Sequence, residues 1–98
     1  MSGVFFSPAA VGDLQEIYDY IAADNAPAAE TLLVDVQQAG EHLVRHPRLG
    51  VGRDDLLPGL RLIVIRKVYV AFYRINGPEI EVVRIVHGRR DFSMLFDL

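Results

Sequence analysis

The strand nearest the C-terminal end of this sequence finishes in a cluster of positive charge. Residues 84–92 read Arg-Ile-Val-His-Gly-Arg-Arg-Asp-Phe, so an imidazole and two adjacent guanidinium groups follow a β-branched run. Guanidinium groups bind carboxylates and phosphates through pairs of parallel hydrogen bonds. The end of this strand is therefore either a phosphate site or a docking point for another protein.

The contact patch predicted for that docking point consists of Arg89, Arg90, Asp91 and Phe92. We expect Arg90 to be exposed and Asp91 to cap a final helical turn within residues 91–97, because a carboxylate accepts hydrogen bonds from the N–H groups at a helix start. The alternative is that Arg90 and Asp91 only tie the C-terminal segment to the helices. Phe92, like Leu95 and Phe96, is also expected to serve packing.

Four further arginines fall on three successive predicted strands: Arg61, Arg66, Arg74 and Arg84. Residues of matching parity on adjacent strands can meet on one face of a sheet, which would make a surface for phosphates or for an acidic partner. The alternative is a set of solvated positions with weak surface ion pairs. His87 could act there as a general acid or base, although a lone histidine beside glycine is more often a hydrogen-bonded turn residue.

The sequence carries no recognisable motif for a cofactor or a metal. It lacks cysteine, a Gly-rich nucleotide loop and a serine nucleophile elbow. His42 and His46 have the i, i+4 spacing of metal ligands, but no third ligand is evident. We interpret them as surface residues near a helix C-terminus, and we expect neither a metal nor a cofactor.

The scaffold that positions these groups begins with a strand and two helices. Residues 4–6 are β-branched and aromatic and predict the strand. Ser7 caps a first amphipathic helix, which ends near Asp24. The break at Asn25 starts a second amphipathic helix that runs to His46, so the two helices form an antiparallel hairpin.

The second half of the scaffold is a small, mainly antiparallel sheet. A glycine- and proline-rich loop over residues 47–59 leads to strands at residues 60–66, 68–75 and 79–87. The predicted fold is therefore α+β, with the order β-α-α-β-β-β. Both faces of the middle strand are apolar, whereas two helices can cover only one face of the sheet. We therefore expect a partner polypeptide to cover the other face.

Length and charge limit the class of protein. The 98 residues suit one compact domain over residues 1–98, with a small core. Residues 1–58 hold three arginines and nine acidic residues, whereas residues 59–98 hold seven cations and four acidic residues. The net charge of −3 disfavours direct sequence-specific DNA binding and general RNA binding. Without cysteine or a long apolar run, we expect a cytoplasmic protein with no membrane contact.

Six short phrases resemble, in order, the ParE branch of the ParE/RelE toxin superfamily. They are Ser7-Pro8-Ala9-Ala10 with Asp13-Leu14, Ile17-Tyr18-Asp19-Tyr20-Ile21, His46-Pro47-Arg48-Leu49-Gly50, Gly59-Leu60-Arg61, Phe72-Tyr73-Arg74 and His87-Gly88-Arg89-Arg90-Asp91. The resemblance covers nearly the whole chain. It implies the fold of that superfamily and the role of toxin in a type II toxin–antitoxin pair.

The resemblance also implies a cognate antitoxin, ParD-like, that wraps the toxin with its C-terminal segment in a hetero-oligomer. For that contact we expect a set of strand residues: Leu62, Val64, Tyr69, Tyr73 and Arg74.

Two activities occur in this superfamily, and they differ in target. ParE-like members inhibit DNA gyrase, whereas RelE-like members cleave messenger RNA on the ribosome. In the second case the residues on phosphates and in proton transfer would be Arg61, Arg74, Arg84 and His87. The acidic balance of the chain and the lack of a tyrosine after Tyr73 favour a gyrase inhibitor that acts by protein binding and is no enzyme. A third interpretation is a chain that only binds an antitoxin.

Overall fold

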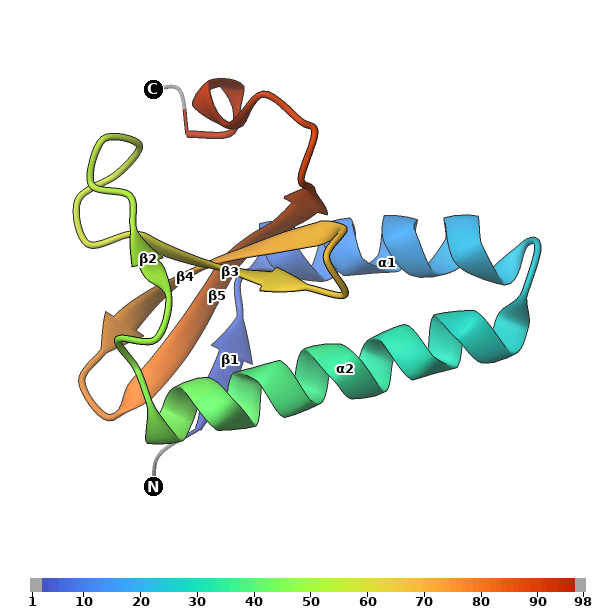
Figure 1. Ribbon diagram of the computed structural model, residues 1–98, viewed down its shortest axis with the longest axis horizontal. Helices are drawn as coiled ribbons and strands as arrows, with labels where there is room; N and C mark the ends of the chain where they lie inside the picture. The colour runs from blue at the N-terminus through green and yellow to red at the C-terminus, as the bar shows by residue number, and fades with distance from the viewer. Residues whose placement is uncertain (1–2, 97–98) are drawn as a thin grey trace.

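Residues 3–96 are described by the computed structural model, in which two helices pack on a five-stranded sheet (Figure 1). The elements are β1 (Val4–Phe6), α1 (Pro8–Ala22), α2 (Ala26–Arg45), β2 (Val51–Gly52), β3 (Arg61–Ile65), β4 (Tyr69–Asn76), β5 (Glu79–His87) and the 3-10 turn η1 (Phe92–Met94). The predicted α+β fold is confirmed. The two-residue β2 goes beyond the prediction, because it exists only through its pairing with β3. Residue 97 of the predicted final turn lies outside the described residues.

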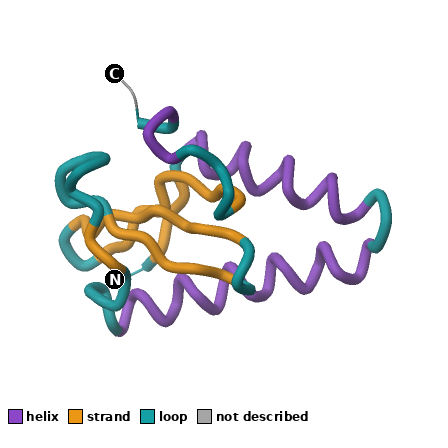
Figure 2. Tube along the Cα trace, turned by 45° about the horizontal axis from the view of Figure 1, so that its top comes forward, coloured by secondary structure: helices purple, strands orange, loops and turns teal. Residues whose placement is uncertain are grey.

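The sheet has the strand order β1-β5-β4-β3-β2, and only β1 runs parallel to its neighbour. The two helices form an antiparallel hairpin beside the strands, as Figure 2 shows. Ser7 caps α1, because its Oγ accepts the Ala10 N–H at 3.0 Å, and the same hydroxyl donates to the Val83 carbonyl at 2.7 Å. Asn25 caps α2 by accepting the Ala28 N–H at 3.1 Å. Both helices therefore begin at the predicted positions.

The face of the sheet that meets the helices carries the main core. Its buried members come from both helices and the three long strands: Ala10, Leu32, Val36, Ile65, Ala71, Val82 and Ile85. A smaller cluster joins Leu43 of α2 to Tyr73 and Ile80. Each large apolar side chain buried here contributes about 1.5–3 kcal/mol, so this packing fixes the helices on the sheet.

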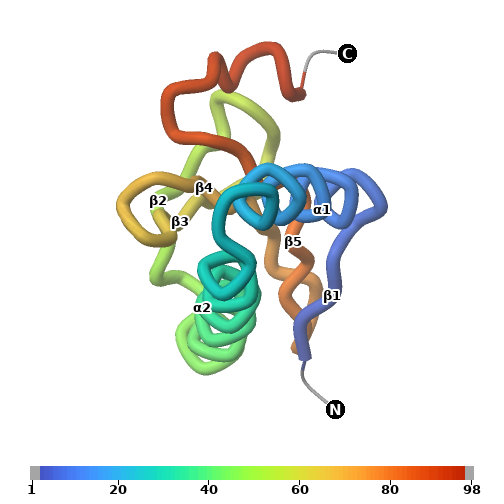
Figure 3. The backbone as a smooth tube through the Cα atoms, turned by 90° about the vertical axis from the view of Figure 1, so that its right-hand side faces the viewer, coloured from blue at the N-terminus to red at the C-terminus, as the bar shows by residue number. Residues whose placement is uncertain are grey.

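The opposite side of the sheet, called the far face below, is covered by the chain itself. Phe72 of β4 is fully buried there (0% exposed), in a cluster with Leu60, Val70 and Val86. The cover comes from the loop before β3 and from the C-terminal segment, through Leu56, Leu57, Phe92, Leu95 and Phe96. Figure 3 shows these two segments together on one side of the sheet.

The prediction that a partner must cover the far face is therefore wrong for the centre of that face. The aromatic residues after β5 reach back over Phe72, which the alternation of apolar residues along one strand could not reveal. At the margin of the far face, Val64 remains 59% exposed.

The loop after α2 is held by the hydroxyl of Tyr73, a fully buried side chain (0% exposed). This hydroxyl accepts the Gly50 N–H at 2.8 Å and donates to the Pro47 carbonyl at 2.7 Å. Arg61 adds hydrogen bonds to the Gly50 carbonyl at 2.7 Å and the Arg48 carbonyl at 3.3 Å. A Cβ at Gly50 would lie 2.6 Å from the Tyr73 ring, so no larger residue fits at this position.

Candidate functional site

The turn after β5 presents Arg89 and Arg90 to solvent. Gly88 opens it by donating its N–H to the Val68 carbonyl at 2.8 Å. The Arg90 N–H donates to the His87 carbonyl at 3.0 Å, and the Arg89 N–H donates to His87 Nδ1 at 3.1 Å. Both arginine side chains are exposed, and neither forms an ion pair within residues 3–96. The turn therefore fixes the backbone and leaves the two guanidinium groups available.

Asp91 holds the next segment in place, and the predicted cap is confirmed. Its Oδ1 accepts the Ser93 hydroxyl at 2.7 Å and the Ser93 N–H at 3.0 Å. These two hydrogen bonds, the hydroxyl first, lower the pKa of Asp91 below its ordinary value. The ionised Asp91 side chain therefore stabilises η1 at pH values above the ordinary pKa of an aspartate. This stabilisation is lost as the pH falls through the lowered pKa of Asp91 in the folded chain.

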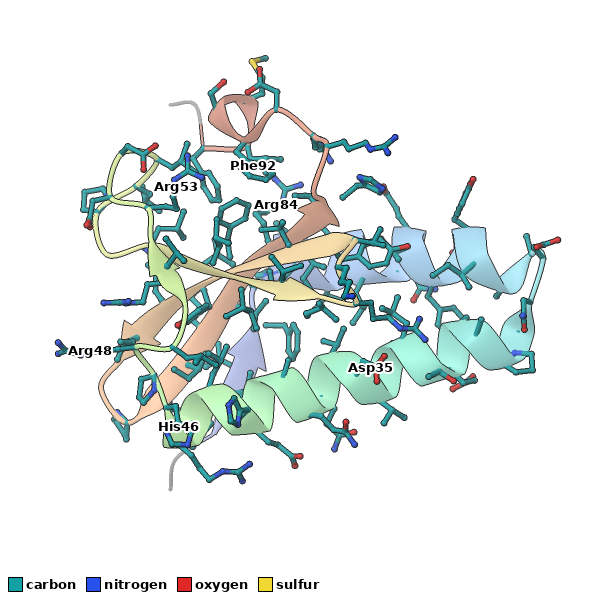
Figure 4. The ribbon with its side chains drawn as sticks, viewed as in Figure 1. Asp35, His46, Arg48, Arg53, Arg84 and Phe92 are labelled. Atoms are coloured by element: carbon teal, nitrogen blue, oxygen red, sulfur yellow. The ribbon has the colours of Figure 1, made fainter. Side chains whose placement is uncertain are left out.

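Phe92 faces the sheet and supports packing. Its ring meets Phe72 edge to face, with ring centres 5.0 Å apart and ring planes at 84°. The Arg53 guanidinium lies 5.9 Å from the centre of the Phe92 ring, and Asp55 holds that guanidinium through two hydrogen bonds of 2.9 Å. Figure 4 shows that Arg53 comes from the loop before β3 and Phe92 from the C-terminal segment. The part of the predicted patch with free cationic side chains is therefore Arg89 and Arg90.

Arg84 is bound by a carboxylate of α1. Its Nε and Nη2 donate to the two Asp13 oxygens at 2.7 and 2.8 Å, and the Ile85 N–H donates to the same carboxylate at 3.0 Å. The hydrogen bond to Asp13 raises the pKa of Arg84. β1 pairs with β5 only as far as Val82, so Asp13 satisfies a strand edge that β1 leaves open.

The other strand arginines are engaged with different partners. Arg74 pairs with Glu81 at 3.0 Å, and Arg66 pairs with Asp35 at 2.8 Å, while the remaining one binds the loop carbonyls described above. Parity along the strands could not show these partners. Of the two interpretations left open by the sequence, the structure favours separate ion pairs for Arg66, Arg74 and Arg84, whereas Arg61 binds backbone carbonyls.

His87 is a hydrogen-bonded turn residue, as the sequence favours. Its exposed ring accepts the Arg89 N–H at Nδ1 and meets the Tyr69 ring edge-on, with centres 6.1 Å apart. Neither contact is a carboxylate that could orient the imidazole for proton transfer. Within the described part of the chain, no three metal-ligating side chains lie close enough together to hold an ion.

The residues predicted to contact an antitoxin do not share one surface. Tyr73 is fully buried, and Tyr69 is half-buried against the core beneath the helices. Leu62 and Val64 lie on the far face, opposite Phe72 and Val70 in the register of β3 and β4. Tyr73 is fully buried in this fold, so it does not suit a contact with a partner, and the contact stays a prediction for Leu62, Val64, Tyr69 and Arg74.

An apolar groove, called the helical groove below, lies where β1 meets both helices. It measures about 640 Å³, and its apolar lining is Val4, Phe6, Leu14, Leu33, Val36 and Val44. A second hollow of about 300 Å³ continues it along α1 and shares Phe6, Leu14 and Leu33. The outer edge of β1 has no strand partner within residues 3–96. The sequence pattern does not reveal this groove, because it assigns the apolar positions of both helices to the core.

Known proteins resemble this chain along most of its length. The model of the family described as ParE toxin of type II toxin-antitoxin system, parDE, matches residues 4–92. Toxin ParE3 of Caulobacter vibrioides is 32% identical over 83 residues, covering 84% of this chain and 82% of that protein. Toxin ParE1 of Mycobacterium tuberculosis is 36% identical over 95 residues, covering 92% of this chain and 93% of that protein. A solved chain described as a chromosomal ParDE TA system from P. aeruginosa has a TM-score of 0.71 and 27% identity, covering 89% of this chain and 96% of that one.

We expect a double-mutant cycle of Asp13→Ala and Arg84→Ala to give a coupling energy of about 1–2 kcal/mol, because the pair is bidentate and largely shielded from water. Urea denaturation of the native chain, both single variants and the double variant measures it. The more exposed pair of Arg53 and Asp55 is the matched control and should couple more weakly. Coupling near zero for Asp13 and Arg84 would contradict the assignment and make Arg84 available for a phosphate.

Proposed function

Because this chain belongs to the family of ParE toxins of type II toxin–antitoxin systems, we propose that it poisons DNA gyrase by binding to it. The observation that carries the proposal is the turn after β5, where Gly88 and His87 hold the backbone while Arg89 and Arg90 remain exposed. A fixed turn with two exposed guanidinium groups suits the recognition of a protein surface, because little conformational freedom of the backbone is lost on binding.

The surroundings of this turn favour binding over catalysis. Ribosome-dependent cleavage of messenger RNA would use Arg61, Arg74, Arg84 and His87. In this structure each of these side chains forms contacts with another part of the chain. The net charge of −3 also opposes close contact with ribosomal RNA. We therefore do not propose a RelE-like ribonuclease.

Membership of the family implies an antitoxin partner, and we propose that it is ParD-like and occupies the helical groove. An apolar groove beside an unpaired strand edge can accept the apolar stripe of a helix or an added strand. The groove holds about 640 Å³ and is lined by apolar side chains of β1 and both helices, whereas the C-terminal segment already covers the centre of the far face. The resulting complex is a hetero-oligomer of toxin and antitoxin.

We place this activity in the cytoplasm, where gyrase acts on DNA. Within residues 3–96, no helix combines the length and the apolar character needed to cross a membrane. The absence of cysteine from the sequence suits a reducing compartment.

Replacing both exposed arginines, Arg89→Ala with Arg90→Ala, should abolish growth inhibition while changing stability by no more than about 0.5 kcal/mol, because neither side chain has a partner in the described fold. The measurement is inducible expression without the antitoxin, followed by plasmid supercoiling and RNA integrity assays on the same cells. The native chain should lower supercoiling and leave messenger RNA uncut.

Arg45→Ala with Arg48→Ala is the matched control for this pair. It removes two exposed arginines elsewhere on the molecule, with Arg48 in the loop after α2 (Figure 4), and should remain toxic. Full toxicity of the Arg89 and Arg90 variant would overturn the site. Codon-specific cuts in messenger RNA with unchanged supercoiling would overturn the function.

Leu33→Glu should weaken binding of the antitoxin by about tenfold or more, because it would bury a carboxylate without a partner at the centre of the helical groove. Co-expression with the neighbouring open reading frame, followed by affinity measurement on the purified pair, tests this. Val64→Glu is the control on the far face and should be neutralised like the native chain. The reverse pattern would move the antitoxin to the far face.

A further inference from the structure

The turn between β3 and β4 holds two long cationic residues in a backbone conformation that L-residues rarely adopt. Arg66 has φ 58° and Lys67 has φ 62°. The Val68 N–H donates to the Ile65 carbonyl at 3.3 Å, so Arg66 and Lys67 are the central residues of a tight turn. Turns with positive φ at both central residues favour asparagine and glycine. By contrast, the positive-φ position in the turn between β4 and β5 is occupied by a glycine, Gly77, with φ 61°. Strained backbone of this kind is concentrated at functional sites.

Arg66 has a structural reason for its position, whereas Lys67 has none within the described chain. Arg66 Nε binds Asp35 Oδ2 at 2.8 Å and so ties the turn to α2. Lys67 is exposed, and no carboxylate of residues 3–96 forms an ion pair with it. The strain at Lys67 is therefore not explained by a contact inside the fold.

The turn between β3 and β4, which contains Lys67, lies at the same end of the sheet as the turn after β5 (Figure 1). The hydrogen bond from the Gly88 N–H to the Val68 carbonyl, 2.8 Å long, joins the two turns. A hollow of about 490 Å³ between them is lined by Lys67, Val68, His87, Gly88 and Arg89. Together with the adjacent Arg90, three of these side chains form what we call the cationic end: Lys67, His87, Arg89 and Arg90.

Positive charge is left uncompensated mainly at this end. Four arginines of the described chain form ion pairs, and Arg61 binds backbone carbonyls. The cations that remain are Arg45, Arg48, Lys67, Arg89 and Arg90. Three of these five belong to the cationic end, so an overall acidic protein keeps a compact patch of exposed positive charge.

We propose that the cationic end binds an acidic segment of a partner polypeptide, which the gyrase proposal above would identify as a segment of gyrase. Carboxylates of that segment enter the hollow and accept hydrogen bonds from the Lys67 ammonium and the Arg89 guanidinium, while Arg90 pairs with a further carboxylate at the rim. The strained turn places Lys67 at this hollow, and glycine at position 67 would relax the turn but lose the ammonium group.

Carboxylates suit this surface better than a nucleic-acid backbone does. A neighbouring hollow of about 340 Å³ brings Asp13 and Glu16 of α1 to the same side as His87 and Arg90. Asp13 is already paired with Arg84, whereas Glu16 has no ion pair within residues 3–96 and would repel a phosphate chain that continues past the site. A short acidic peptide segment can end at the hollow between the turns and avoid α1.

NMR titration of the full chain at low salt tests the chemistry of the ligand. The probes are an acetylated octaglutamate peptide and a thymidylate octanucleotide. We expect the peptide to shift the amide signals of residues 66–68 and 87–90 and to leave those of residues 45–48 unchanged. Tighter binding of the oligonucleotide at the cationic end, or no peptide binding there, would overturn the proposal.

Lys67→Gly tests the surface without risk to the fold. It removes the ammonium group and relaxes the turn, so we expect about tenfold weaker peptide binding together with a higher Tm. Arg48→Gln removes the same charge from the loop after α2 and should bind the peptide like the native chain. Unchanged affinity of Lys67→Gly would contradict the proposal.

Toxicity of the same variants separates this proposal from the one on gyrase. If the native chain lowers supercoiling and Lys67→Gly is equally toxic, the hollow at Lys67 is not the docking site for an acidic segment of gyrase, and the gyrase proposal, which depends on Arg89 and Arg90, stands. If the native chain leaves supercoiling unchanged while the peptide still binds at the cationic end, the gyrase proposal fails and the site belongs to another acidic partner.

Discussion

The ion pair between Asp13 and Arg84 is the contact on which both the fold and the charge pattern depend. The Asp13 carboxylate binds the Arg84 guanidinium at 2.7 and 2.8 Å and the Ile85 N–H at 3.0 Å, at a point that β1 is too short to reach. Through this contact α1 docks on the edge of β5, and a strand arginine is neutralised. Arg61, Arg66 and Arg74 are also engaged by other groups. The exposed cations at this end of the sheet, Lys67, Arg89 and Arg90, therefore lie in the turns.

The C-terminal segment has two roles that follow from its place beside the sheet. The ring centres of Phe92 and Phe96 lie 5.0 and 5.1 Å from the ring centre of Phe72, and these two side chains help to cover the far face. The turn just before them displays Arg89 and Arg90. A small sheet can thus cover much of both faces with its own chain, while the helical groove stays open beside β1.

Local signals in the sequence predict the elements well. The cap at Ser7 and the break at Asn25 each depend on neighbouring residues, and the structure has a helix start at both. The exposure of Arg90 and the cap at Asp91 follow from the same kind of local chemistry.

Contacts between distant residues could not be predicted in this way. Asp13 and Arg84 are 71 positions apart, and Tyr73 and Gly50 are 23 apart, so no spacing rule connects them. The positive φ of Lys67 depends on the register of β3 and β4, which pairs Ile65 with Tyr69 and leaves residues 66–68 for the turn. The sequence therefore indicated which groups carry charge, and the tertiary pairing decided which of them remain exposed.

The central claim is that the two turns at the end of the sheet, and neither helix, contact the toxin's target. Amide hydrogen exchange of the full chain, alone and bound to purified gyrase, tests it most directly. The account predicts slower exchange on binding in residues 66–68 and 87–90, with residues 26–45 unchanged. Protection confined to α2 and β1, with the two turns exchanging as in the free chain, would contradict it.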